Sequence, residues 1–122
     1  MKKYIIAGGR DFGNYNALEE VLRYYKSDIN EVVSGDAFGA DSLGIRWAVY
    51  NNIPIKHFPA DWNQYGKSAG FIRNADMGDY ADAAICFWDK KSKGTAHMIR
   101  TMKLFHKPCY VYDYNGNLLE EF

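Results

Sequence analysis

The sequence has no apolar run that approaches the roughly 18 to 20 residues of a membrane-spanning helix. The start at Met1-Lys2-Lys3 leads into only a short apolar segment, so we expect no signal peptide. Cysteine is scarce, and Cys86 and Cys109 lie far apart in apolar segments. This pattern excludes a disulfide scaffold and a cysteine metal site, and it favours buried free thiols. A cytoplasmic protein without a membrane anchor is therefore expected.

An excess of charge of either sign is also missing, because 15 basic residues balance 15 acidic ones. Proteins that depend on contacts with the nucleic-acid phosphate backbone usually carry a basic excess. The balance therefore argues against tight nucleic-acid binding. His57, His97 and His106 are scattered, so we expect no metal centre, and no sequence feature indicates a tightly bound cofactor.

Linkers, low-complexity tracts and long repeats are absent, and the length is that of one ordinary domain. Five short β-rich runs alternate with four segments of helical periodicity. We expect strands at 4–7, 32–33, 53–58, 83–87 and 110–112, and helices at about 16–25, 40–48, 68–81 and 95–105. This alternation predicts one α/β domain over residues 1–122, a doubly wound, Rossmann-like parallel sheet of five strands with about four helices on its two faces.

Two details of the helices are also predicted. Asn16 and Glu19 have the spacing of a capping box at the start of the first helix. Phe105 continues the apolar stripe of the last helix and is expected on its buried face.

Glycines follow the first strand, at the edge where open α/β sheets bind their ligands. Gly8 and Gly9 allow backbone N–H groups to approach an anion at the start of a helix. Arg10 offers a planar fork for a phosphate, and Asp11 could accept a hydrogen bond from a ribose hydroxyl. The spacing differs from the GxGxxG of dinucleotide folds, so NAD is not implied. A tight turn with Arg10 and Asp11 paired in solvent is the alternative.

The loop after the second strand repeats this design. Ser34, Gly35 and Gly39 precede a helix whose first turn contains Asp41. Asp41 is a candidate ligand or catalytic residue. An acid that only favours the positive end of the helix dipole explains it equally well.

Aromatic residues make up 16% of the chain, and several fall in expected loops. Phe12, Trp62 and Trp88 are candidates to stack on a base. Gly94 and Thr95 open the last helix after a lysine-rich loop, an arrangement that can hold an anion.

The third helix presents four further candidates on its first turns, Gly70, Arg73, Asn74 and Met77. An arginine near a helix start is opposed by the positive end of the dipole. Such a position is typical of an arginine that binds phosphate or takes part in catalysis. An exposed salt bridge is the alternative.

In order along the chain, these loops resemble a known family. They read Gly-Gly-Arg-Asp-Phe, Ser-Gly-x-Ala-x-Gly-Ala-Asp, Phe-Pro-Ala-Asp-Trp-x-x-Tyr-Gly-Lys-x-Ala-Gly-x-x-Arg-Asn-x-x-Met and Lys-Gly-Thr. This order is similar to the YspA-like branch of the SLOG superfamily, which includes the DprA/Smf and LOG proteins. The resemblance runs from Tyr4 to Tyr112, and Phe58 to Met77 is its most specific part.

The resemblance implies a Rossmann-like sheet of strand order 3-2-1-4-5 and a nucleotide or nucleotide-derived ligand. It also implies roles in nucleotide sensing and in bacterial or phage conflict. LOG enzymes cleave the base from a nucleoside monophosphate and carry Pro-Gly-Gly-x-Gly-Thr-x-x-Glu at the last loop. Here the glycine pair is missing and Met98 stands at the place of the glutamate, while Arg73 matches its arginine partner. The positions that match the family are Gly8, Gly9, Arg10, Gly35, Gly39, Asp41, Gly70, Arg73, Asn74, Met77, Gly94 and Thr95.

The leading hypothesis is a sensor or sequestering protein for a phosphorylated nucleotide derivative. A nucleoside phosphate, an ADP-ribose-like molecule and a cyclic nucleotide signal are the ligands considered. The alternative is a nucleotide N-glycosidic hydrolase that uses Arg73 with Asp41, Asp11 or His97. DNA binding like that of DprA is opposed by the neutral charge, and a homo-oligomer is left open.

Overall fold

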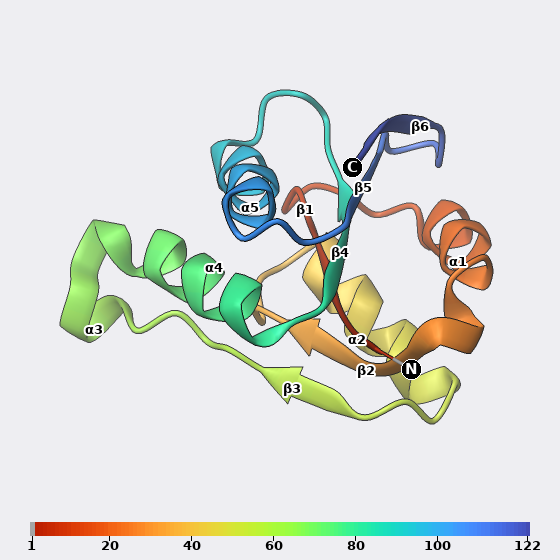
Figure 1. Cartoon of the computed structure of the whole chain (residues 1–122), viewed down its shortest axis with the longest axis horizontal. Helices are drawn as coiled ribbons and strands as arrows, with labels where there is room; N and C mark the ends of the chain where they lie inside the picture. The colour runs from red at the N-terminus through yellow and green to blue at the C-terminus, as the bar shows by residue number, and fades with distance from the viewer. Residues whose placement is uncertain (1) are drawn as a thin grey trace.

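The computed structural model describes residues 2–122, and within them one six-stranded sheet has the order β3-β2-β1-β4-β5-β6 (Figure 1). Neighbouring strands from β3 to β5 are parallel, and β6 is antiparallel to β5. The strands are β1 (Lys2–Gly8), β2 (Ile29–Ser34), β3 (Ile55–His57), β4 (Ala83–Phe87), β5 (Cys109–Tyr112) and β6 (Leu118–Glu121). The expected Rossmann-like α/β fold and the order of its first five strands are confirmed, with a sixth strand added at one edge.

Four longer helices cover the two faces of this sheet. Helices α1 and α2 contribute to one hydrophobic cluster, and α4 and α5 contribute to the other, so the sheet is doubly wound. The helices are α1 (Tyr15–Arg23), α2 (Ala40–Tyr50), α4 (Ala69–Tyr80) and α5 (Lys93–Leu104), with a single-turn α3 (Trp62–Tyr65) before α4. Among the described residues, none of these helices has the length and apolar character needed to cross a bilayer.

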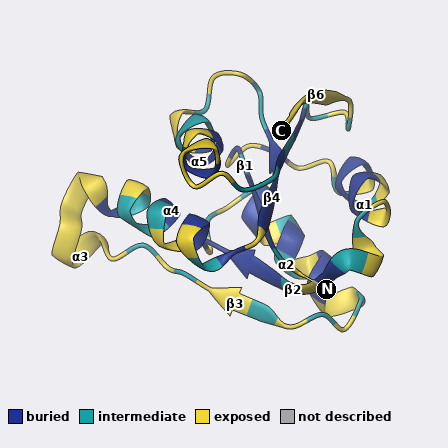
Figure 2. Ribbon diagram, in the orientation of Figure 1, coloured by how far each residue is buried: buried dark blue, intermediate teal, exposed yellow. Residues whose placement is uncertain are grey.

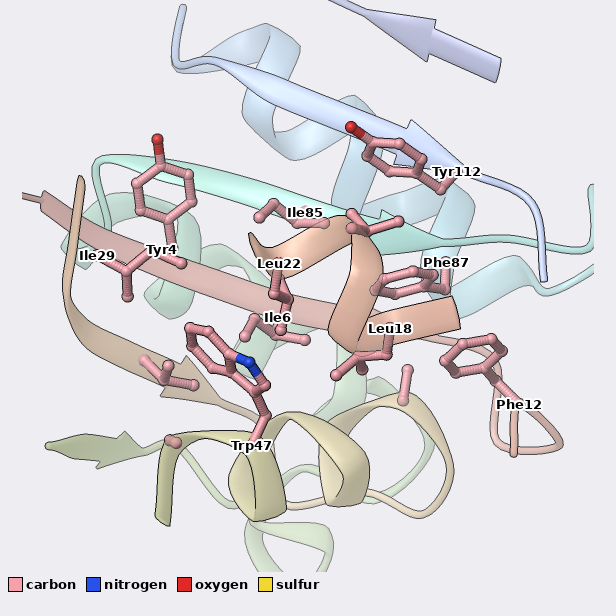
Figure 3. Packing of buried hydrophobic residues seen from close by; sticks show 14 of the residues in the cluster. Tyr4, Ile6, Phe12, Leu18, Leu22, Ile29, Trp47, Ile85, Phe87 and Tyr112 are labelled. Carbon is pink, nitrogen blue, oxygen red and sulfur yellow. The ribbon is translucent and has the colours of Figure 1, made fainter. Parts of the chain in front are cut away.

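The central strands are buried on both faces, as the dark ribbon of β1 and β4 shows (Figure 2). Alternate residues of a strand point to opposite faces, so Tyr4 and Ile6 enter the α1–α2 cluster while Ile5 and Ala7 enter the α4–α5 cluster. Figure 3 shows the first cluster, in which Trp47 of α2 and the leucines of α1 converge on the face of β1. Continuous apolar runs are therefore required in these strands.

Two predicted helix details are wrong. The N-cap of α1 is Asn14, whose Oδ1 accepts a hydrogen bond from the Ala17 N–H at 3.1 Å. Asn16 therefore lies inside the helix, and Glu19 pairs with Arg23 instead of closing a capping box. Phe105 follows the last residue of α5, and 40% of its surface is exposed because the chain turns there.

The third strand and the C-terminal tail also differ from expectation. β3 has only three residues instead of the six expected at 53–58. Beyond β5 the chain makes a hairpin, in which the Asp113 carboxylate accepts hydrogen bonds from the Asn115 and Asn117 N–H groups at 2.9 Å. The hairpin also carries Tyr114, whose hydroxyl donates to the Asp11 carboxylate at 2.5 Å. The turn between β5 and β6 thus contacts the loop after β1 and restrains it.

Backbone contacts join the loops that follow β1 and β2. The carbonyl oxygen of Gly9 accepts hydrogen bonds from the N–H groups of Phe12 and Ala40, each at 3.2 Å. Gly39 approaches the same oxygen with φ +75°, and a Cβ atom there would lie 2.2 Å from it. Gly8 is equally confined, because its Cβ would lie 2.3 Å from the Phe87 carbonyl oxygen. Gly39 thus allows the loop after β2 to contact the loop after β1, and Gly8 allows the end of β1 to contact the end of β4.

We predict that Gly39→Ala lowers the free energy of unfolding by about 2 to 3 kcal/mol, because alanine must adopt a positive φ and displace a backbone carbonyl. Urea unfolding measures this. Gly13→Ala is the matched control, since its added methyl group meets no atom within 4 Å, and its effect should stay within about 0.5 kcal/mol. Equal effects of the two substitutions would contradict the packing argument.

Candidate functional site

A cavity of about 470 Å³ opens at the carboxyl ends of β1 and β4, where the strand order reverses. The loop after β1 forms one wall, the first turns of α4 form a second, and the start of α5 forms a third. Its volume is that of a small-molecule site. Twelve of the residues expected at a ligand site line it: Gly8, Gly9, Arg10, Asp11, Asp41, Trp62, Gly70, Arg73, Asn74, Met77, Gly94 and Thr95.

Five expected site residues lie outside this lining. Phe12 is buried in the core and stacks on Phe87 with ring centroids 4.7 Å apart, so it is not available to a base. Trp88 packs against the α4–α5 cluster, and its indole N–H donates to the Ser92 carbonyl at 3.0 Å.

The other three of these residues lie at the end of β2 and in the loop between β2 and α2. The Ser34 hydroxyl accepts a hydrogen bond from the Asp36 N–H at 3.2 Å and is buried. Gly39 supports the backbone contact already described. Gly35 lines an adjoining cavity.

Six further lining residues were not among the expected ligand-binding residues: Ala7, Ala37, Lys67, Phe71, Ser92 and Met98. Lys67 follows α3 in a 3₁₀ turn that leads into α4, and this compact segment brings both Lys67 and Trp62 over the cavity. The Gly-Lys-Ser sequence at 66–68 was the available signal, although it lies too far from a strand end to form a P-loop.

Arg73 reaches from α4 to the loop after β2. Its Nη1 donates to the Gly35 carbonyl oxygen at 2.5 Å, and its Nε donates to the Asn74 Oδ1 at 3.1 Å. Burial lowers the pKa of Arg73, and the nearby charge of Arg10 lowers it further. Arg73 is therefore a partly buried guanidinium held by neutral oxygens. It makes no ion pair within 4 Å among residues 2–122, so the exposed salt bridge considered as an alternative does not describe it.

Asp41 lies beside Arg73 with 5% of its surface exposed. One carboxylate oxygen accepts a hydrogen bond from the Ala37 N–H at 3.2 Å. Burial raises the pKa of Asp41 to about 6, although the Ala37 N–H and the Arg73 charge both act in the opposite direction. A carboxyl group in this state exchanges a proton close to physiological pH, so it can donate or accept one inside the cavity.

Asn74 connects the cavity wall on α4 to the start of α5. Its amide nitrogen donates to the Gly94 carbonyl oxygen at 3.2 Å and lies 3.2 Å from the Nδ1 of His97. Because an amide nitrogen only donates, His97 Nδ1 is the acceptor. Burial and the charge of Arg100 lower the pKa of His97. His97 lines a separate hollow with Arg100 and is not among the residues of the cavity.

Residues 3–65 match the model of the YspA, cpYpsA-related SLOG family. The chain is also 34% identical over 110 residues to the Gene 61 protein of Mycobacterium phage D29, across 82% of this chain and 87% of that protein. This chain belongs to the YspA-related SLOG family. The resemblance deduced from the loop motifs is thereby confirmed.

Two solved structures share the fold of this SLOG protein. DprA from Streptococcus pneumoniae superposes with a TM-score of 0.68 at 16% identity, covering 92% of this chain and 49% of DprA. DprA from Helicobacter pylori, whose structure is described for its single-stranded DNA binding mode, gives 0.64 at 21% identity, covering 90% and 64%. The SLOG chain thus spans about half to under two thirds of these proteins, and the likeness extends to the Rossmann-like sheet.

We predict that Asp41→Asn changes how stability depends on pH. Because the pKa of Asp41 is raised in the folded protein, the stability that its protonated form contributes is present below about pH 4 and is lost as the pH rises through 6. A shift from 3.8 to about 6 corresponds to roughly 3 kcal/mol. Removing the titration should make Asp41→Asn more stable relative to wild type at pH 7 than at pH 4.

Urea unfolding of both proteins from pH 4 to 7 measures this difference. Asp76→Asn, on the exposed face of α4, is the matched control and should keep the wild-type profile. If the free energy of unfolding depends on pH in the same way for wild type and Asp41→Asn, the raised pKa of Asp41 is contradicted.

Proposed function

We propose that this protein binds a phosphorylated, nucleotide-derived small molecule in the cavity at the ends of β1 and β4, as a sensor or a sequestering protein. The observation that carries the proposal is the convergence of cations. Arg10, Lys67 and Arg73 come from three separate segments and line one cavity. None of them pairs with a carboxylate within 4 Å in the described chain. Like charges repel, and a bound phosphate would relieve that repulsion.

The start of α5 supplies a second element suited to a phosphate. The first N–H groups of a helix have no partner inside the helix, and the helix dipole is positive there. Gly94 and Thr95 of this first turn line the cavity, and the Thr95 N–H already donates to the Ser92 hydroxyl. A Cβ atom added at Gly94 would meet no atom within 4 Å. A phosphate oxygen can therefore approach the backbone closely at this point.

Groups suited to a nucleoside surround the same space. Trp62 is 52% exposed above Gly70, so its ring can stack on a base. Asp11 lines the cavity with its carboxylate held by Tyr114, and Asp41 of α2 lines the same cavity. Either carboxylate can accept a hydrogen bond from a ribose hydroxyl.

A small molecule is favoured over a nucleic-acid strand, although one of the DprA structures is described for single-stranded DNA. The net charge of this chain is zero. Binding to a polyanion depends on many cations that release counterions, whereas three clustered cations are enough for one phosphate. Given the phage protein among the relatives, we propose phage–host conflict as the setting in which the signal is bound.

The first test compares nucleotides with their nucleosides. Because the cations recognise phosphate, nucleotides should raise the Tm by mass action, and the matching nucleosides should leave it nearly unchanged. Thermal-shift measurements give this comparison, and mass spectrometry of what co-purifies with the protein identifies the natural ligand. Equal shifts with nucleotides and nucleosides would overturn the phosphate assignment.

We further predict that Gly94→Ala weakens nucleotide binding at least about tenfold without loss of stability. The added methyl group occupies the space beside the helix start, while alanine raises helix propensity by up to about 1 kcal/mol. Calorimetric titration and a melting curve measure the two effects. Gly13 lines neither this cavity nor the adjoining one, so Gly13→Ala should keep wild-type affinity. A similar loss of affinity in Gly13→Ala would contradict phosphate binding at Gly94.

A nucleotide N-glycosidic hydrolase is the second candidate, and Asp41 is the observation that favours it. A carboxyl group with a pKa of about 6 lies in the cavity beside Arg73. Against it, buried Met98 lines the cavity at the position where LOG enzymes have glutamate, and a thioether cannot protonate a leaving base.

We therefore expect nucleoside monophosphates to be recovered unchanged after long incubation with the protein. Chromatography of the free base measures this. Release of base that is catalytic and is lost in both Arg73→Ala and Asp41→Asn would establish the hydrolase instead.

A further inference from the structure

We propose that the ligand has two nucleoside ends joined through a bridging phosphate or pyrophosphate, and that its second base stacks on Phe38. This inference rests on the proposed function. A second cavity of about 400 Å³ adjoins the first. The two cavities share four lining residues, Arg10, Ala37, Trp62 and Arg73. Both guanidiniums therefore stand between two spaces, each large enough for part of a ligand.

The position of the arginines distinguishes a bridging phosphate from a terminal one. A ligand that ends in phosphate needs space on only one side of its anion. Here Arg10 and Arg73 line open space on both sides, and Trp62 lines both cavities as well. Two linked nucleosides have their anion between two bases, so the anion would lie at Arg10 and Arg73, one base in the first cavity and the other in the second.

The second cavity has its own surface for a base. Phe38 is 76% exposed and lines only this cavity, together with Pro59 and Ala60. A phenyl ring with this exposure contributes little to the core, because most of its surface stays in water. Bases stack readily on such rings irrespective of their identity.

The wall of the second cavity is held in place by contacts of its own. Asp36 lines this wall in a left-handed conformation with φ +60°. Its N–H donates to the Ser34 hydroxyl at 3.2 Å, and its carboxylate accepts from the Nδ1 of His57 at 2.6 Å. These two bonds restrain the loop that carries Phe38, so this loop would lose less conformational entropy when a ligand binds.

The test uses calorimetric titration with the four symmetric dinucleoside 5′–5′ pyrophosphates and the matching nucleoside mono- and diphosphates. At least one pyrophosphate should bind about tenfold or more tightly than its nucleoside diphosphate. Phe38→Ala should remove that advantage and leave the affinity for the monophosphate unchanged. Tyr24→Ala, which truncates another exposed aromatic residue outside both cavities, is the control and should change neither affinity.

The outcomes distinguish failure of the two-ended ligand from failure of the proposed nucleotide binding. If mono- and diphosphates bind but no pyrophosphate binds more tightly, or if Phe38→Ala weakens all of them equally, the two-ended ligand is overturned and the phosphate site stands. If no nucleotide binds, both are overturned. Deoxyoligonucleotides of about four to about sixteen residues are titrated as well. Affinity that rises with strand length and falls steeply with salt would identify a nucleic acid and overturn the small ligand.

Discussion

The site depends on one close contact between two backbone segments. The carbonyl oxygen of Gly9 accepts hydrogen bonds from the loop after β1 and from the start of α2, and Gly39 lies against the same oxygen. A side chain at Gly39 would separate the two loops. Arg10 lies directly beyond this contact, and Asp41 lies in the helix that begins there. The glycines of these loops thus bring the charged groups together, and they do so mainly by allowing the backbones to pack.

The consequence is a cavity whose polar groups are restrained before any ligand arrives. Arg73 is held by Gly35 and Asn74, and Asn74 in turn holds the start of α5. Burial opposes the charged forms of both Arg73 and Asp41, which raises the free energy of the empty site. Groups held in this way lose little conformational entropy on binding, so more of the interaction energy contributes to affinity.

Alternating apolar segments were enough to predict the doubly wound sheet, because strands buried on both faces leave a continuous apolar signal. β6 left no such signal, since all four of its residues are exposed. At the site, the glycine loops were predicted from their position at strand ends, and the start of α4 was predicted from an arginine that the helix dipole opposes. Phe12 was misassigned to the ligand because a loop residue that stacks on Phe87 cannot be distinguished in sequence from one that faces solvent. Lys67 was missed because its place over the cavity depends on the turn that follows α3.

Net charge and local charge carry different information in this protein. Equal numbers of acids and bases weaken long-range attraction to a polyanion. Three cations that make no ion pair with the residues described still line one cavity. The two acids that line the same cavity are restrained, Asp11 by the Tyr114 hydroxyl and Asp41 by burial. The local excess of positive charge is therefore largest when Asp41 is protonated. An anion that binds between Arg10 and Arg73 would raise the pKa of Asp41 further, so anion binding and proton uptake at this site should favour each other.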